Sequence, residues 1–341
     1  MPPRRALLLL TALAPLLGAA VATPAALVAP TPFDVSRPEI SAFITQAAAR
    51  TGLASAEIEA LLAQAQSQPA ILDAMSRPAE RVLPWWQYRA RFLEAQRIKA
   101  GVQFWELHHD LLARIERERG VPAEYLVAIV GIETSYGRVM GRYRVLDALA
   151  TLGFDYPPRA EYFRKELEQF LLMTREEQLD PLVVRGSYAG AMGAPQFMPS
   201  SYRRYAVDAD NQGRRDLWTD WSDVLASVAN YFIENGWQAG EPVLADTAVD
   251  HDRDDPMGFQ LALGETLGSI RARGYAVQAT LPDSAPAMLV PAEQEESMSW
   301  RVGFTNFFVI TRYNRSPRYA MAVHDLAQAL RARVPKAEDP I

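Results

Sequence analysis

The chain has 341 residues, of which 49% are hydrophobic, an ordinary composition for a folded protein with one elaborated domain or two. Its formal net charge of -6, with both signs interspersed, gives no electrostatic basis for nucleic acid binding. It contains no cysteine, which excludes disulfide bonds and the attachment of a lipid through an N-terminal cysteine.

Residues 1–22 have the pattern of a secretory signal peptide. The basic pair Arg4–Arg5 precedes an apolar run that is interrupted by Pro15, and small residues lead to Ala22. The run is shorter than the ~20 residues that a membrane helix needs, so we expect cleavage after Ala22, with an uncleaved anchor as the alternative. Residues 23–38 contain four prolines and are expected to form a linker.

Helical patterns dominate the chain from residue 39 to about residue 250. Residues 39–118 predict several helices that form an N-terminal helical domain. Pro122 begins the next helix, and Gly137 is expected to end it. Between the later helices, residues 186–202 contain three glycines and two prolines, which indicates a loop that closely approaches another part of the molecule.

The C-terminal part changes character. Residues 258–310 and their edges contain three short runs rich in β-branched and aromatic residues, FQLAL, YAVQATL and FFVITRY, which predict a small sheet. A last amphipathic helix covers residues 320–333. The predicted fold class is therefore mainly α, with a small β domain (α+β).

Glu133 is a carboxylate in an apolar helix. The helix is predicted to be buried because apolar residues cover most of its circumference: Leu126, Val127, Ile129, Val130 and Ile132. Burial disfavours the charged form and raises the pKa of a carboxyl, which suits a general acid near neutral pH. The alternative is a structural glutamate that accepts backbone hydrogen bonds or pairs with Arg138 or Arg142, and position alone leaves the two interpretations balanced.

The glycine-rich loop of residues 186–202 also has two interpretations. Ser187 and Gln196 are hydrogen-bonding side chains on a backbone with little bulk, which suits a polar, extended ligand such as a sugar chain. Alternatively, the segment is a packed Ω-loop with Met192 and Phe197 in the core.

An acidic stretch resembles a calcium-binding loop. Three residues occupy positions one, three and six of the EF-hand spacing: Asp208, Asp210 and Gly213. Position five is Gln212 and position twelve is Thr219, so a bidentate carboxylate would come later, from Asp220 or Asp223. An acidic turn that caps the next helix explains the same residues without a metal.

Other chemistries lack their sequence patterns. The four histidines show no zinc-ligand spacing, and no G-x-S-x-G motif surrounds Ser135, which counts against a serine hydrolase.

Four long segments resemble, in the same order, those of the B-type lytic murein transglycosylases, glycoside hydrolase family 103: GIETSYGRVMGRYRVLDALATLGFDYPPRAEYF, GSYAGAMGAPQFMPSSYRRYAVD, DLWTDWSDVLASVANYFIENGW and FFVITRYNRSPRYAMAVHDLA. The resemblance covers the chain from about Phe33 onward. It implies a lysozyme-like core in residues 119–250, which includes the EF-hand-like loop, beside the helical domain of residues 39–118. A small β domain in residues 251–312 and a C-terminal helical segment in residues 313–335 that packs back on the core would complete the fold.

The resemblance implies cleavage of the MurNAc-β-1,4-GlcNAc bond of peptidoglycan with formation of 1,6-anhydromuramoyl ends. Glu133 matches the single catalytic acid, which protonates the leaving oxygen and then, as a carboxylate, takes the proton of the C6 hydroxyl. This fits a sequence without an obvious second carboxylate at the site, unlike most glycosidases. A hydrolytic muramidase and a non-catalytic peptidoglycan-binding protein are the alternatives.

Further positions match substrate-binding residues of that family. Ser187 and Gln196 would face the sugar beside the acid, and Phe197 would form an apolar wall. Arg159 matches the second member of an arginine pair, whose first position is Pro158 here. The other matching subsite residues are Tyr88, Tyr231, Tyr313, Asn314 and Tyr319.

The resemblance also implies a structural calcium ion, with no cofactor needed for the chemistry. The matching ligand positions are Asp208, Asp210, Gln212, Arg214 and Asp223. The expected partners are peptidoglycan glycan strands and other cell-wall enzymes, without nucleic acid or a lipid anchor. The expected state is a soluble monomer in the periplasm.

Overall fold

The computed structural model describes residues 29–76, 83–248 and 259–334. The predicted signal peptide and the first part of the predicted linker lie outside the described residues. Within those three ranges, every helix is too short or too polar to cross a bilayer.

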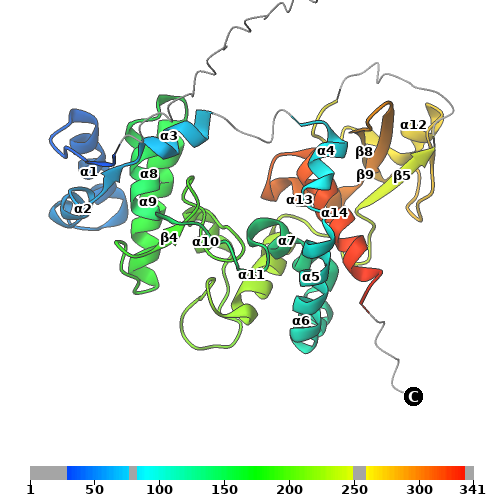
Figure 1. Cartoon of the computed structure of the whole chain (residues 1–341), viewed down its shortest axis with the longest axis horizontal. Helices are drawn as coiled ribbons and strands as arrows, with labels where there is room; N and C mark the ends of the chain where they lie inside the picture. The colour runs from blue at the N-terminus through cyan, green and yellow to red at the C-terminus, as the bar shows by residue number, and fades with distance from the viewer. Residues whose placement is uncertain (1–28, 77–82, 249–258, 335–341) are drawn as a thin grey trace, which may run out of the picture.

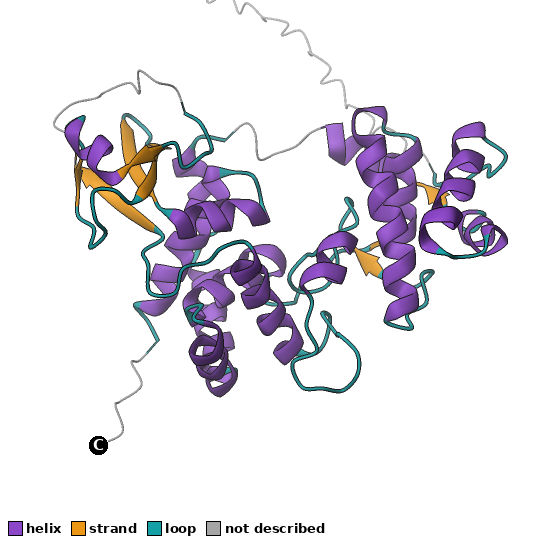
Figure 2. Cartoon of the chain, turned by 180° about the vertical axis from the view of Figure 1, so that it is seen from behind, coloured by secondary structure: helices purple, strands orange, loops and turns teal. Residues whose placement is uncertain are grey.

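Helices form most of the described chain (Figures 1 and 2). One end of the molecule consists of α1 (Pro38–Thr51), α2 (Ser55–Leu62), α3 (Pro69–Ser76), the short 3-10 helix η2 (Pro157–Arg159), α8 (Val145–Phe154) and α9 (Ala160–Glu176). The middle contains α7 (Ala123–Thr134), α10 (Pro199–Tyr205) and α11 (Trp221–Glu234). Beside them lie α4 (Trp85–Ala90), α5 (Ala95–Leu107), α6 (His109–Arg119), α13 (Thr305–Tyr313) and α14 (Pro317–Arg331).

An antiparallel sheet of five strands stands at the opposite end from α1 (Figure 2). Its strands are β5 (Leu244–Ala248), β6 (Glu265–Thr266), β7 (Ala276–Val277), β8 (Pro286–Glu293) and β9 (Met298–Gly303), in the order β6-β8-β9-β5-β7. The helix α12 (Leu267–Ala272) shares a small core with this sheet, in which Leu267 and Ile270 meet Trp300. Two short ladders lie elsewhere: β1 (Thr31–Pro32) with β2 (Gln66–Ser67), and β3 (Tyr143–Arg144) with β4 (Arg185–Gly186).

The prediction of strands was wrong for two of the three runs. FQLAL, residues 259–263, forms bends, and FFVITRY, residues 307–313, belongs to the helix α13. β propensity depends on context, and in FFVITRY the buried residues Phe307 and Ile310 are three positions apart, which suits one face of a helix. Asn306 fixes the start of α13, because its amide bonds the backbone of Gln238 and Glu241 at 2.8–2.9 Å.

The elements of residues 39–118 pack in two different places. The helix α1 contacts α9 and α2, and α3 contacts α8, whereas α4–α6 contact α7, α14 or both. The sheet also begins earlier than residue 251, because β5 starts at Leu244.

The helix α7 forms the centre of the larger core. It contacts α5, α6, α11 and α14, and nearly all of its side chains are buried. A helix surrounded on all sides needs apolar residues around its whole circumference, and this explains why its sequence shows little amphipathic period.

His324 of α14 makes a polar contact with this central helix. Its Nδ1 lies 2.9 Å from the hydroxyl of Tyr125 in α7. Burial, and then the charge of Arg301, lower the pKa of His324 from 6.5 to about 4, against the opposing charges of Asp325 and Asp246. The folded chain therefore holds this imidazole neutral.

We expect the substitution His324→Gln to reduce the loss of stability on acidification. The unfolded chain binds a proton on His324 near pH 6.5 and the folded chain only near pH 4, so the stability is complete above pH 6.5 and falls as the pH drops toward 4. The difference amounts to about 3 kcal/mol. Urea unfolding from pH 7 to pH 4 measures it, with the exposed His109→Gln as the control that keeps the decline. An unchanged profile in His324→Gln would contradict the assignment.

Candidate active site

Glu133 lies in the last turn of α7 and is half-buried. Its Oε1 accepts a hydrogen bond of 2.6 Å from the hydroxyl of Tyr319, which is buried in the first turn of α14. Burial, and then the negative charge of Glu133, raise the pKa of Tyr319 well above its ordinary value. The phenol therefore stays protonated and donates to the carboxylate. One oxygen of Glu133 is thereby held in place from a second helix.

The helix α7 ends at Thr134, so the expected stop at Gly137 was wrong by three residues. Ser135 and Tyr136 follow with φ angles of 51° and 63°, a left-handed conformation that costs a residue with a side chain roughly 1–2 kcal/mol. The hydroxyl of Thr134 accepts from the amide of Gly137 at 3.0 Å, and this bond closes the turn before Gly137. The chain thus reverses directly behind Glu133.

The glycine-rich loop of residues 186–202 approaches the segment that follows Glu133. A Cβ atom on Gly141 would collide with the backbone of Gly186 and Ser187, so the two stretches touch through their backbones. The hydroxyl of Thr134 also donates to the carbonyl of Ala194 at 2.9 Å. The close approach expected of this loop is therefore to the end of α7 and the residues after it.

The Ω-loop interpretation describes part of this loop. Met192 and Phe197 are buried in the core, as in a packed Ω-loop. The two polar side chains are half-buried and hydrogen-bonded. The hydroxyl of Ser187 accepts from the backbone amide of Ala191 at 3.0 Å, and the side-chain amide nitrogen of Gln196 donates to the carbonyl of Met140 at 3.2 Å. Gln196 also has a φ of 52°, so its backbone turns sharply beside the segment after Glu133.

Aromatic residues from three helices gather beside Glu133. The Tyr313 and Tyr319 rings are stacked, with centroids 6.4 Å apart, and Tyr231 lies 4.7 Å from Tyr313. The hydroxyl of Tyr313 donates to the carbonyl of Pro195 at 2.6 Å, which ties α13 to the glycine-rich loop. Burial and the charge of Glu133 raise the pKa of Tyr313, so this phenol is also a permanent donor. Phe197 completes the group, 5.8 Å from Tyr313.

The remaining substrate-binding candidates lie at different places. Tyr88 is buried in α4, close enough to influence Tyr319 electrostatically. Asn314 directly follows α13 and is half-buried. Arg159 is exposed in η2, where its guanidinium stacks on Tyr162 at 4.5 Å, so its contacts lie on α9 instead of with the tyrosines around Glu133.

Three carboxylates come together at the acidic loop. Asp208, Asp210 and Asp223 each offer an oxygen, and these oxygens lie within 4.8 Å of one another. Ligands placed 2.3–2.6 Å from one calcium ion can be at most about 5 Å apart, so the cluster fits that ion. Burial raises the pKa of Asp223. Desolvation, and then the neighbouring carboxylate of Asp220, raise the pKa of Asp210. A bound cation would reduce the electrostatic repulsion between these neighbouring carboxylates.

The other two positions of the calcium prediction contribute differently. The side chain of Gln212 donates to Asp210, and its backbone amide donates to Asp208 at 3.0 Å. The guanidinium of Arg214 lies 3.6 Å from Asp216, so only the backbone carbonyl of Arg214 is suitable for a cation. Asp220 caps α11 by accepting from the amide of Ser222 at 2.8 Å, as the metal-free alternative requires.

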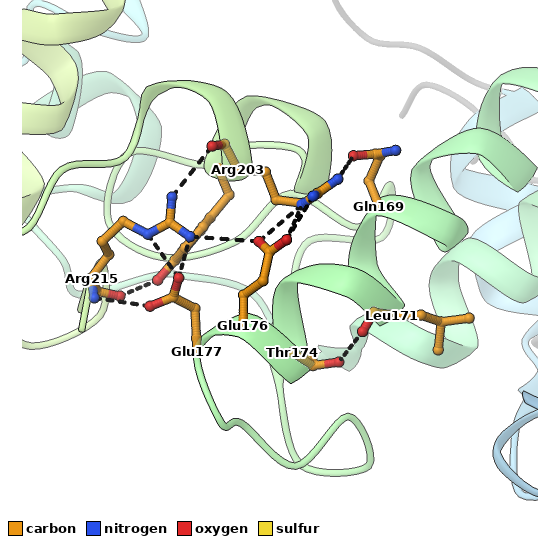
Figure 3. A network of polar contacts seen from close by, with 8 residues as sticks. Gln169, Leu171, Thr174, Glu176, Glu177, Arg203 and Arg215 are labelled. Atoms are coloured by element: carbon orange, nitrogen blue, oxygen red, sulfur yellow. Dashed lines mark hydrogen bonds and ion pairs between the residues drawn. The ribbon is translucent and has the colours of Figure 1, made fainter. Parts of the chain in front are cut away.

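An ion-pair network fixes the far end of the acidic loop (Figure 3). Arg215 pairs with Glu177 at the end of α9, and its Nε lies 2.7 Å from that carboxylate. Arg203 of α10 pairs with the neighbouring Glu176 at 2.6 Å and bonds Gln169. These ion pairs anchor this end of the loop on α9 and α10.

Thr134 is a site residue with no signal in the sequence. Its bond to Ala194 joins positions 60 residues apart, and a threonine at a helix end has no feature that predicts such a partner.

The comparisons with known proteins agree on one group. Residues 36–328 match the family described as "Transglycosylase SLT domain". The chain is 42% identical over 304 residues to "Membrane-bound lytic murein transglycosylase B" of Escherichia coli (strain K12), covering 86% of this chain and 83% of that protein.

Two solved structures agree with these matches. The crystal structure of soluble lytic transglycosylase SltB1 from Pseudomonas aeruginosa superposes with a TM-score of 0.81 at 47% identity, covering 87% of this chain and 99% of that one. The Escherichia coli lytic transglycosylase Slt35 in complex with calcium gives a TM-score of 0.79 at 39% identity, covering 89% and 96%. The predicted fold class, mainly α with a lysozyme-like core and a small sheet, is confirmed.

We expect the substitution Thr134→Val to destabilise the chain by about 1–3 kcal/mol. Valine keeps the shape but leaves the amide of Gly137 and the carbonyl of Ala194 without their partner. Equilibrium unfolding in urea measures the change. The matched control is Thr45→Val on the exposed face of α1, which should stay within about 0.5 kcal/mol of the parent. Equal effects of the two substitutions would contradict the structural role of Thr134.

Proposed function

Because the chain belongs to the transglycosylase SLT domain family, we propose that Glu133 is its single catalytic acid and base. The protein is a lytic transglycosylase, a lyase that degrades peptidoglycan. The observation that carries the assignment of Glu133 is its position: a half-buried carboxyl at a helix end, held by Tyr319 at 2.6 Å beside a loop with little side-chain bulk.

The proposed reaction uses two proton transfers through one carboxyl group. Glu133 first donates its proton to the oxygen between C1 of MurNAc and C4 of GlcNAc, and the C1–O bond breaks. The resulting carboxylate then takes the proton of the C6 hydroxyl, and that oxygen bonds to C1. Glu133 ends protonated and no water is consumed, so the product carries a 1,6-anhydro ring.

Tyr319 has a defined part in this cycle. It donates to Oε1 of Glu133 and so orients the carboxyl group that would transfer the proton. A donor also favours the carboxylate form that must accept the C6 proton. Its buried phenol gives the same support throughout the ordinary pH range.

We assign the glycan strand to the surface formed by the glycine-rich loop and the tyrosines. Ser187 and Gln196 would bond the sugar hydroxyl and acetamido groups, and Phe197 would support their backbone from the core. The other residues proposed to meet the strand are Tyr88, Tyr231, Tyr313, Asn314 and Tyr319. Arg159 would contact a distant part of the substrate, because it stands on η2 away from this cluster.

Hydrolysis is the alternative outcome at the same site, with water in place of the C6 hydroxyl. The bonding of Glu133 is compatible with either nucleophile, so the product decides. We further propose that residues 1–22 direct export and that the enzyme works in the periplasm on the glycan strands of the cell wall.

We propose that calcium binds at the acidic loop as a structural ion. Asp208, Asp210 and Asp223 would supply carboxylates, Gln212 a side-chain oxygen after rotation, and Arg214 its backbone carbonyl. The Slt35 structure from Escherichia coli contains calcium, which supports this proposal. The bound ion would reduce the repulsion among the acidic groups.

We expect Glu133→Gln to lower the rate of muropeptide release by about 10²–10⁴-fold, since glutamine can neither donate nor accept the proton. Release from purified peptidoglycan, followed by mass spectrometry, measures both rate and product. The parent should give anhydromuramoyl ends, and reducing muramic ends would establish hydrolysis instead.

The matched control for Glu133→Gln is Glu124→Gln, a half-buried glutamate in the first turn of the same helix, which should keep the parent rate. If Glu133→Gln folds and also keeps that rate, Glu133 is not the acid.

We expect excess calcium to raise the melting temperature by several degrees relative to chelator. An ion that binds only the folded chain stabilises it by about 2.7 kcal/mol at 100 times its Kd. Asp210→Asn should abolish the shift, whereas the exposed Asp110→Asn should keep it. Identical melting curves of the parent with calcium and with chelator would exclude the ion.

A further inference from the structure

The sequence places Tyr136 three residues after Glu133, and the structure puts its ring inside the molecule. The side chain is buried although its backbone has a φ of 63° and lies in a turn. An aromatic residue in this conformation persists only where its surroundings fix it. The contacts of the ring therefore explain why the chain accepts the strain.

The ring of Tyr136 occupies a slot between α5 and α7. Two glycines form the walls of the slot: a Cβ on Gly131 would lie 2.7 Å from the hydroxyl oxygen of Tyr136, and a Cβ on Gly101 would collide with the same atom. The ring also stacks on Phe104, with centroids 5.6 Å apart. Gly131 of α7 and Gly101 of α5 are thus the positions where the ring needs room.

Hydrogen bonds with Arg97 hold the residues on both sides of Glu133. The hydroxyl of Tyr136 donates to the backbone carbonyl of Arg97 at 3.1 Å, and the guanidinium of Arg97 donates to the carbonyl of Gly131 at 2.5 Å. The amide of Ser135 bonds Val130 instead of Gly131, which leaves the Gly131 carbonyl for Arg97. The same guanidinium reaches the hydroxyl of Ser135 at 3.1 Å. Glu133 lies between Gly131 and Ser135.

We propose that Tyr136 is a positioning residue: its ring, wedged between Gly101 and Gly131, holds the last turn of α7 so that Glu133 meets Tyr319. The role rests on the proposed function of Glu133. Arg97 contributes to the same positioning, because its hydrogen bonds join the residues on either side of Glu133 to the first turn of α5. Precise placement is needed because a catalytic group displaced by about 1 Å can lose about 10²-fold in rate.

The test compares Tyr136→Leu, which removes the ring, with Tyr136→Phe, which keeps the wedge. Tyr136→Leu should lower kcat about 10–100-fold with KM unchanged within about twofold, and Tyr136→Phe should restore most of the rate. Leu167→Ala, a buried leucine of α9, is the control for lost stability. Measured well below its melting temperature, it should keep kcat.

A second measurement does not depend on activity. Amide hydrogen exchange across residues 130–137 should speed up in Tyr136→Leu and in Arg97→Met, and stay at the parent rate in Leu167→Ala. Unchanged exchange in Tyr136→Leu, or an equal fall of kcat in Tyr136→Leu and Leu167→Ala, would overturn the proposal. If the parent forms no anhydromuramoyl ends, only the proposed function is refuted. The exchange measurement still tests whether Tyr136 holds the last turn of α7.

Discussion

The hydrogen bond between Tyr319 and Glu133 is the interaction on which the site depends. It joins residues 186 positions apart, so it exists only when α14 has packed against α7. The bond fixes one carboxylate oxygen of a residue at the end of a buried helix. The bond therefore couples the completion of the fold to the placement of the Glu133 carboxylate, because α14 supplies the donor.

The arrangement around that bond follows from competing demands. A catalytic carboxyl must be dry enough to hold a proton and open enough to meet a sugar. In the role proposed for Glu133, its half-buried position at the end of α7 is a compromise between these demands, since the chain turns away at Ser135. The cost is backbone strain at Ser135 and Tyr136, which buried contacts offset. Gln196 of the glycine-rich loop, which approaches the segment after Glu133, has a similar left-handed conformation.

The sequence predicted some parts of this arrangement better than others. The burial of α7 followed from apolar residues on all its sides, and the mainly helical class followed from periodicity. The end of α7 was misplaced because Thr134 and Tyr136 find their partners in distant segments. FFVITRY was mistaken for a strand because its β-branched and aromatic residues suit both structures, and contacts with α14 and Asn306 decide in favour of a helix. Local patterns carry no information about such partners.

The residues around Glu133 show the same limit more sharply. Tyr231, Tyr313 and Tyr319 come from three helices, and each alone resembles a core tyrosine; only the resemblance to a family grouped them in advance. The acidic loop is connected to the glycine-rich loop near Glu133. The amide of Ala194 bonds the carbonyl of Leu217, just beyond that loop, at 2.7 Å, and α10 connects Phe197 to Asp208 within a few residues. The cation proposed at Asp208 would therefore stabilise the glycine-rich loop through these connections.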